Sequence, residues 1–228
     1  MTPDDKSRIT IVIPTKDEEE NLPWVLERVR DYADEIMVVD GHSRDRTREI
    51  AEAGGATVVL DDRTGKGGAL RVAARAARNE ILVYIDADGS HDPSVIPAMV
   101  EPILRDEADL VIGSRMRGGS DELHSSIPEI IRLFGSEIIT VTINQRFGVR
   151  LTDYQNGFRA IRRDVMLKLR TRETTFTIEQ EMAMRALKRR YRLAEVPAHE
   201  YSRRFGTSHI VVWKVGPRYV WCLLKNLV

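Results

Sequence analysis

Cysteine is almost missing from this chain of 228 residues, which holds Cys222 alone. One cysteine cannot form an internal disulfide framework, and this composition is typical of a reducing compartment such as the cytoplasm. Long apolar runs are missing too, because the sequence has no stretch of about 18 apolar residues to span a bilayer unaided. The polar start, MTPDDKSR, lacks the apolar region of a signal peptide. We therefore expect a cytoplasmic protein, soluble or peripheral to a membrane.

An excess of charge of either sign is also lacking, because Lys+Arg and Asp+Glu both number 35. A neutral chain has no long-range attraction to a polyanion, so nucleic acid is not an expected partner. The sequence has no internal repeat and no low-complexity linker to mark a domain boundary. Its length suits one large α/β domain with a substantial core, and we predict a single domain over residues 1–228.

Apolar, β-branched runs alternate with helical patterns through the first half of the chain. The expected strands are Ile9–Ile13, Glu35–Asp40, Ala56–Leu60, Ile81–Ile85 and Asp109–Ile112. The expected helices begin at Asp17, at Ser43 or Asp45, near Gly65, and at Pro93. Strand and helix that alternate at about 20–25 residues imply right-handed βαβ units and a mostly parallel sheet flanked by helices.

Helical patterns dominate the second half. The expected helices are Pro128–Phe147, Asp164–Leu169 and Glu179–Lys188, with strands after the loop Asp153–Arg159 and at Tyr191–Val196. The C-terminal segment, Ile210–Val228, mixes aromatic residues and leucines with basic residues. That pattern predicts an interfacial helix that lies on a membrane. A helix that packs on the core or on a second subunit is the alternative.

Two aspartates, Asp86 and Asp88, follow directly on an expected buried strand in ILVYIDADGSHDP. Side chains alternate along a strand, so these two project the same way. Carboxylates that close together repel unless a cation or a shared proton neutralises them. A hard divalent cation that also binds a diphosphate would neutralise both carboxylates. The alternative is a pair of capping or solvent-facing acids, and Asp92 is expected only to cap the helix at Pro93.

Four segments are expected to converge at one edge of the sheet: Pro14–Glu18, Asp40, Gly65–Gly67 and Asp86–Asp88. Ligands of parallel α/β sheets bind outside the carboxyl ends of the strands. The amides and ammonium of Gly65–Gly67 can hold a diphosphate or sugar, although the same residues suit an ordinary turn. Asp40 can accept a hydrogen bond from a base or ribose, or it can simply end its strand.

Arginines of the second half suit an anionic ligand. Arg132 and Ser136 lie four residues apart on one helical face and can serve one ligand together. The loop Arg203–Ser208 combines paired arginines with glycine and serine, and guanidinium binds phosphate in a fork. A surface arginine and a solvated turn are the respective alternatives.

Seven short motifs occur in one order along the chain. They are PTKDEEENL (Pro14–Leu22), VVDGHSRDRT (Val38–Thr47), GKGGAL (Gly65–Leu70), DADGSHDP (Asp86–Pro93), GSR (Gly113–Arg115), DYQNGFRA (Asp153–Ala160) and RRFGTSH (Arg203–His209). Together they resemble the family 2 glycosyltransferases with a GT-A (Rossmann-like) fold. Within that family, they resemble the dolichol-phosphate mannosyltransferase-like branch, whose members glycosylate polyprenyl phosphates. The resemblance covers Ile9 to His209, nearly the whole chain.

The resemblance implies a role for each matching residue. It implies a nucleotide-sugar-binding half at residues 1–113, an acceptor half at 114–209 and an amphipathic segment at 210–228. Asp86 and Asp88 would bind Mg²⁺ or Mn²⁺. The residues implied to contact the donor are Pro14, Lys16, Glu18, Asp40, Lys66, Asp86 and Ala87. The implied acceptor site comprises Arg132, Ser136, Asp153, Arg203 and Ser208. Catalysis would depend on Asp88, Arg115, Arg132, Arg203 and Glu181, with Glu179 as a rival for Glu181.

Three positions depart from the family pattern. Gly41 replaces a second aspartate of many relatives, Lys16 replaces a tyrosine, and Ser90 stands where some relatives have a metal-reaching glutamine. These departures leave the base, the sugar and the third metal ligand open. The QxxRW signature of processive synthases is absent, which argues against polymerisation.

The resemblance implies a metal-dependent, inverting transfer of one hexose from a GDP- or UDP-sugar to a polyprenyl phosphate. The acceptor phosphate is already anionic, so no general base is needed. The expected partners are these substrates and the inner face of a membrane, with or without a membrane-spanning protein. One alternative is transfer to a hydroxyl, with Asp153 or Glu181 as base. Another is a catalytically silent subunit that binds nucleotide sugars.

Overall fold

In the described part of the chain, seven strands form one sheet in the order β3-β2-β1-β4-β6-β5-β7. The computed structural model describes residues 1–121, 127–206 and 212–227, except the side chains of 127–131 and 212–214. The strands are β1 (Ile9–Thr15), β2 (Glu35–Asp40), β3 (Thr57–Leu60), β4 (Ile81–Tyr84), β5 (Leu110–Ser114), β6 (Arg159–Arg162) and β7 (Leu193–Pro197). The predicted strands are all present, with ends that differ by a few residues.

The sheet is mostly parallel, as predicted. β1 pairs with β2 and β4, β2 with β3, and β5 with β7, all in parallel. β6 is the exception, because it lies between β4 and β5 and runs antiparallel to both. The carboxyl ends of β1, β2, β3 and β4 therefore meet at one edge, where the sequence predicted a site.

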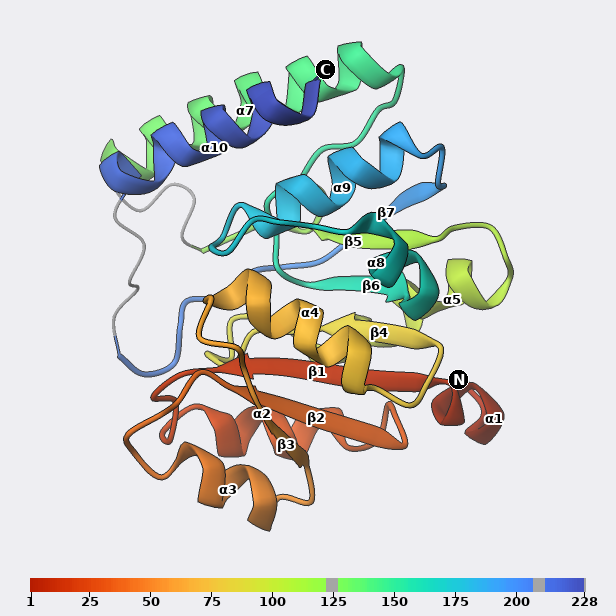
Figure 1. The fold of residues 1–228 in the computed structure, drawn as a ribbon, viewed down its shortest axis with the longest axis vertical. Helices are drawn as coiled ribbons and strands as arrows, with labels where there is room; N and C mark the ends of the chain where they lie inside the picture. The colour runs from red at the N-terminus through yellow and green to blue at the C-terminus, as the bar shows by residue number, and fades with distance from the viewer. Residues whose placement is uncertain (122–126, 207–211, 228) are drawn as a thin grey trace.

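Helices flank both faces of this sheet (Figure 1). They are α1 (Pro3–Ser7), α2 (Leu22–Val29), α3 (Thr47–Ala53), α4 (Lys66–Ala76), α5 (Ile96–Leu104), α6 (Arg115–Gly118), α7 (Ile127–Phe147), α8 (Arg163–Leu169), α9 (Ile178–Lys188) and α10 (Val212–Leu227). A 3-10 turn at Pro93–Val95 leads into α5, and Asp92 caps it through the N–H of Ser94, as predicted. The short helices α1 and α6 were not predicted.

The start of α2 corrects one prediction. The helix begins at Leu22 rather than at Asp17, and its first turn contains no acid. Asp17 has a left-handed backbone with φ of 54°. The N–H groups of Glu18 and Glu19 donate to Thr47 Oγ1 and Asp45 Oδ2 across the neighbouring loop. These contacts hold residues 17–19 in a turn that is bonded to the loop after β2. The acids of this segment therefore connect two loops at the carboxyl ends of the strands and do not begin a helix.

Alternation along the strands divides the core between the two faces of the sheet. One cluster, beneath α4, α8 and α9, contains Val12, Leu82, Tyr84, Ile161 and Met182. The other, beneath α2 and α5, contains Ile11, Ile13, Val38, Val83 and Phe158. Neighbours such as Ile11 and Val12 thus face opposite layers, and the sheet is buried on both sides.

The helices α7 and α10 form a pair at the top of the view in Figure 1. They run side by side, and Arg146 near the end of α7 donates to the carbonyl of Leu227 at the end of α10. One face of α10 is buried through Cys222 and Leu223, whereas Trp221 on another face is 61% exposed. Packing on the core, the alternative considered above, therefore holds for one face of α10. No helix within the described ranges has the length and apolar character to cross a membrane.

Candidate active site

A cavity of about 1270 Å³ lies at the carboxyl ends of β1 to β4. Three of the four predicted segments line it, through Pro14–Glu18, Gly65 with Lys66, and Asp86–Asp88. The opposite wall comes from Arg115, the 152–157 loop, α7 and α10. The cavity thus joins the first half of the chain to the second.

Asp86 follows β4 and faces a lysine ammonium and an imidazole ring. Its Oδ1 lies 2.7 Å from Nζ of Lys66, and its Oδ2 lies 3.7 Å from Nε2 of His91. Burial opposes ionisation, but Lys66 and then His91 outweigh it and hold the pKa of Asp86 well below its usual range. A Cβ at Gly157 would lie 2.6 Å from Oδ2, so only glycine lets the opposite loop approach this carboxylate so closely. Asp86 is therefore a permanent anion in the cavity wall.

Asp88, two residues further on, is oriented by its own loop. Its Oδ1 accepts from the N–H of Ser90 at 3.0 Å and from the Ser90 hydroxyl at 2.7 Å. Its Oδ2 lies 3.7 Å from the guanidinium of Arg203. Ser90 therefore positions Asp88, and Oδ2 remains directed to a cationic partner. The two carboxylates line one cavity, as their spacing predicted.

Lys66 connects Asp86 to a second acid, Glu179 of α9. Its ammonium lies 2.9 Å from Oε1 of Glu179, whose side chain is 2% exposed. Burial disfavours the charged lysine, but the two carboxylates raise its pKa above the usual value. A Cβ at Gly67 would lie 2.1 Å from the carbonyl oxygen of Glu173, so glycine is required for α4 to begin against this backbone.

Glu179, rather than Glu181, lies on the cavity wall. Glu181 is 2% exposed, and its Oε2 accepts the N–H groups of Arg172 and Glu173, both at 2.7 Å. Its Oε1 pairs with Arg185 at 2.7 Å. Two residues on a helix are about 200° apart around its axis, so both acids cannot face one cavity. Glu181 therefore supports the packing of α9, and its rival Glu179 is the acid that lines the cavity.

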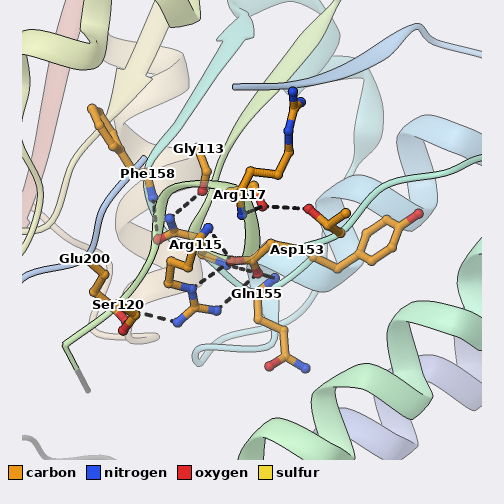
Figure 2. Close-up of polar contacts among 12 residues, drawn as sticks. Gly113, Arg115, Arg117, Ser120, Asp153, Gln155, Phe158 and Glu200 are labelled. Atoms are coloured by element: carbon orange, nitrogen blue, oxygen red, sulfur yellow. Dashed lines mark hydrogen bonds and ion pairs between the residues drawn. The ribbon is translucent and has the colours of Figure 1, made fainter. Parts of the chain in front are cut away.

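Arg115 and Asp153 form a two-pronged ion pair beside the cavity (Figure 2). Nε and NH2 of Arg115 lie 2.7 Å and 3.1 Å from the two Asp153 oxygens, and NH1 lies 3.3 Å from Glu200. Ser120 donates to the other Glu200 oxygen, and the N–H of Gln155 donates to Asp153. Burial opposes ionisation of Asp153, but Arg115 outweighs it and lowers its pKa. Arg115 and Asp153, both predicted site residues, therefore hold each other in place in the cavity wall.

Arg203 reaches the donor side of the cavity from the far end of the chain. Its NH2 lies 2.5 Å from Oε1 of Glu18, and its NH1 faces Asp88. The next residue, Arg204, donates its N–H to the carbonyl of Asp88 and stacks on Trp24 at 4.7 Å. Three segments distant in sequence therefore meet around Asp88. Ser208, predicted to bind the acceptor, lies outside the described residues.

The α7 and α10 side of the cavity combines charge with apolar surface. Arg132 and Ser136 both line it from α7, as their four-residue spacing predicted. The apolar residues beside them are Leu133, Ile139, Val215, Pro217 and Val220. Tyr219, also on this wall, donates its hydroxyl to the carbonyl of Phe176 and thereby fixes α10 to the loop before α9.

The nucleotide residues expected around β1 and β2 divide into two groups. Pro14, Lys16, Glu18 and Ala87 line the cavity. Asp40 is fully buried, and its carboxylate accepts the N–H of Ser43 at 3.1 Å and 3.3 Å, behind the cavity wall. Asp40 does not line the cavity, and its contact with base or ribose stays a prediction.

Sequence reasoning missed several residues of the cavity wall. They are His42, Asp61, Arg63, Asn156, Phe176 and Tyr219. Asp61 could have been found, because it directly follows a predicted strand, as Asp86 does. The others face the cavity through loop and helix packing, for which the sequence has no periodic signal.

Comparison with known proteins agrees with this geometry. A family model described as "Glycosyl transferase family 2" matches residues 10–170. The chain is 33% identical to an undecaprenyl-phosphate mannosyltransferase of Micrococcus luteus, over 93% of this chain and 91% of that protein. It is 30% identical to the low-salt glycan biosynthesis hexosyltransferase Agl6 of Haloferax volcanii, over 96% of this chain. It spans only 53% of that relative's length.

A solved structure shares the fold. Glucosyl-3-phosphoglycerate synthase of Mycobacterium tuberculosis, in complex with Mn²⁺, UDP-glucose and phosphoglyceric acid, superposes with a TM-score of 0.75. The match covers 97% of this chain and 80% of that chain, at 21% sequence identity. The mostly parallel, helix-flanked sheet is thus the GT-A fold. The chain belongs to glycosyl transferase family 2, and its enzyme class is glycosyltransferase.

Proposed function

We propose that this glycosyltransferase transfers one hexose, mannose or glucose, from a GDP- or UDP-sugar to a polyprenyl phosphate, with inversion at the anomeric carbon. The observation that carries the proposal is the two-sided cavity. One wall presents carboxylates and an ammonium group, through Asp86, Asp88 and Lys66. The other presents Arg132 among apolar side chains of α7 and α10. An acceptor with an anionic head and a hydrocarbon tail matches the second wall.

The donor wall suits a divalent cation. Asp86 and Asp88 offer carboxylate oxygens, the ligands that Mg²⁺ and Mn²⁺ prefer, and Asp86 already pairs with one cation, Lys66. Among the described residues, no cluster of three or more His, Cys, Asp or Glu could hold a metal alone. The donor diphosphate and water would therefore complete the coordination. When bound, Mg²⁺ or Mn²⁺ neutralises charge on the departing diphosphate.

The acceptor wall suits a nucleophile that needs no base. A polyprenyl phosphate is anionic at neutral pH, so positioning beside the anomeric carbon is the main requirement. Arg132 and Arg203 would balance its charge against the donor phosphates. Neither carboxylate predicted as a base is suited to that task. Arg115 lowers the pKa of Asp153 and occupies both of its oxygens, which makes it a weak proton acceptor, and Glu181 does not line the cavity. This arrangement favours phosphate over hydroxyl as the acceptor.

The outer face of the helix pair supports a membrane location. Phe134 and Ile138 on α7 are both 68% exposed. The neighbouring exposed residues are Val141, Trp221 and Leu224. Exposed aliphatic and aromatic residues on an amphipathic helix are typical of interfacial binding. Since the inner side of the same pair lines the cavity, we place this surface on the cytoplasmic face of a membrane, where a lipid acceptor would enter.

Transfer to a phosphorylated, water-soluble acceptor is the second candidate. It is favoured by the structure-level likeness to an enzyme solved with phosphoglyceric acid. In that case Glu179, a further carboxylate of the cavity wall, would be the candidate base.

Radiolabelled nucleotide sugars offered with undecaprenyl phosphate and phosphoglyceric acid in one reaction would separate the candidates. We expect label to enter the organic phase from one GDP- or UDP-hexose, and only when Mg²⁺ or Mn²⁺ is present. Label that remains in water, as free hexose or as a glycosylated soluble acid, would contradict the lipid acceptor.

A further inference from the structure

One end of the cavity extends away from Asp86 to the edge strand β3. Gly41, His42, Asp61 and Arg63 line it there. The order β3-β2-β1-β4 places three interstrand spacings of about 4.8 Å between β4 and β3, roughly 14 Å in all. A nucleoside diphosphate with its phosphates at Asp86 has a comparable reach. Its base would then lie over the residues that follow β2 and β3.

Asp61 is built into this end of the cavity as an oriented acceptor. It directly follows β3, and its N–H donates to the carbonyl of Asp40 at 3.0 Å. Its side chain is 6% exposed, and Oδ1 lies 3.4 Å from Nε2 of His42. The N–H of Arg63 donates to the same Oδ1 at 2.9 Å. Within the described ranges, Oδ2 accepts no hydrogen bond, so one oxygen of a nearly buried carboxylate is left for a ligand.

The backbone around Asp61 holds this arrangement in place. His42 and Arg63 both have left-handed conformations, with φ of 61° and 60°. Such conformations are uncommon outside glycine and persist where the surroundings determine them. His42 is further tied to the Asp61 carbonyl, 3.2 Å from its Nε2. The Asp61 carboxylate therefore faces the cavity from a loop that is held in place by hydrogen bonds to the loop after β2.

We propose that Asp61 selects the nucleobase of the donor by accepting the ring N–H of a keto base; this inference rests on the proposed function. Guanine at N1 and uracil at N3 each present an N–H beside a keto oxygen. Cytosine and adenine present an unprotonated ring nitrogen instead, and two acceptors face to face repel. The Arg63 guanidinium on the same wall is a donor suited to the keto oxygen. Asp61 lies on the cavity wall, whereas Asp40 lies behind it.

Calorimetric titration with UDP, GDP, CDP and ADP in the presence of Mn²⁺ tests this role. We expect the wild type to bind UDP, GDP or both at least about thirtyfold more tightly than CDP and ADP. The UDP and GDP arms tell which keto base is preferred. In Asp61→Asn the amide can also donate to a ring nitrogen, so this preference should fall by about tenfold or more.

Asp62→Asn is the matched control, because Asp62 is exposed and lies outside the cavity wall. Its carboxylate accepts from Thr64, a contact that asparagine keeps. It should bind all four nucleotides as the wild type does. An unchanged base preference in Asp61→Asn, or equal wild-type affinity for all four nucleotides, would overturn the inference. Selective keto-base binding without hexose transfer would uphold Asp61 and reject the proposed reaction.

Discussion

Nζ of Lys66 lies 2.7 Å from Oδ1 of Asp86, so a lysine ammonium sits against the carboxylate proposed to bind a metal. The same ammonium also neutralises Glu179. One side chain therefore balances two largely buried acids. Binding of a divalent cation to Asp86 would release Lys66 toward the donor phosphates, so the metal and the lysine are expected to compete.

Lys66→Met should lower the free energy of unfolding by about 3 kcal/mol, because both acids lose their partner. Added Mn²⁺ should then raise the melting temperature more in the variant than in the wild type, since Asp86 is free to take it. Thermal melts with and without Mn²⁺ measure both effects. Lys168→Met removes an exposed lysine paired with Asp164 and should leave stability unchanged. Melts of Lys66→Met that match the wild type would contradict this competition.

Glu179→Gln and Glu181→Gln should separate function from structure. Because Glu179 faces the cavity, its substitution should reduce kcat/KM for hexose transfer by at least about tenfold. Glu181→Gln loses its ion pair with Arg185 and should lower stability by about 1–2 kcal/mol while activity remains near normal. Steady-state kinetics and chemical denaturation of both variants provide the measurement. The reverse pattern would restore Glu181 as the functional acid.

Acid should weaken the fold partly through Asp153. Its pKa is lowered in the folded state, so its contribution to stability is present above the unfolded pKa of about 3.9. That contribution is lost as the pH falls through the lower, folded pKa. Urea denaturation at a series of pH values should therefore show a shallower acid decline for Asp153→Asn than for the wild type. Parallel curves would mean that Arg115 does not hold this carboxylate in solution.

Substitution of Trp221 and Leu224 by serine should reduce binding to phosphatidylglycerol vesicles at least about fivefold, because the exposed apolar face of α10 is lost. Co-sedimentation measures the bound fraction. Leu167→Ser changes an exposed leucine on α8, far along the chain from this helix pair, and should bind as the wild type does. Equal sedimentation of all three proteins would contradict membrane binding through α10.

Much of the fold could be predicted from the sequence because strand and helix periodicities are local. The antiparallel direction of β6 could not, because it depends on where a strand enters a sheet already formed. The short helices α1 and α6 have too few turns to show a periodic face.

The candidate site also contains residues that the sequence could predict and residues that it could not. Asp86 and Asp88 were found because a strand end predicts their direction. Asp40 ends β2 and Asp61 directly follows the neighbouring strand β3, but only tertiary packing decides that Asp40 lies behind the wall and Asp61 on it. Glu179 and Glu181 differ by a rotation about α9, which sequence similarity alone did not resolve.

The central claim is metal-dependent transfer to a polyprenyl phosphate. The variant Asp88→Asn tests this claim most directly, with Asp92→Asn as its control. Asparagine can still cap the turn at residue 92, so that control should transfer hexose to undecaprenyl phosphate at the wild-type rate. Asp88→Asn should lose at least about a hundredfold of the Mn²⁺-dependent transfer into the organic phase. Wild-type transfer by Asp88→Asn, or transfer that survives removal of all divalent cations, would contradict the account.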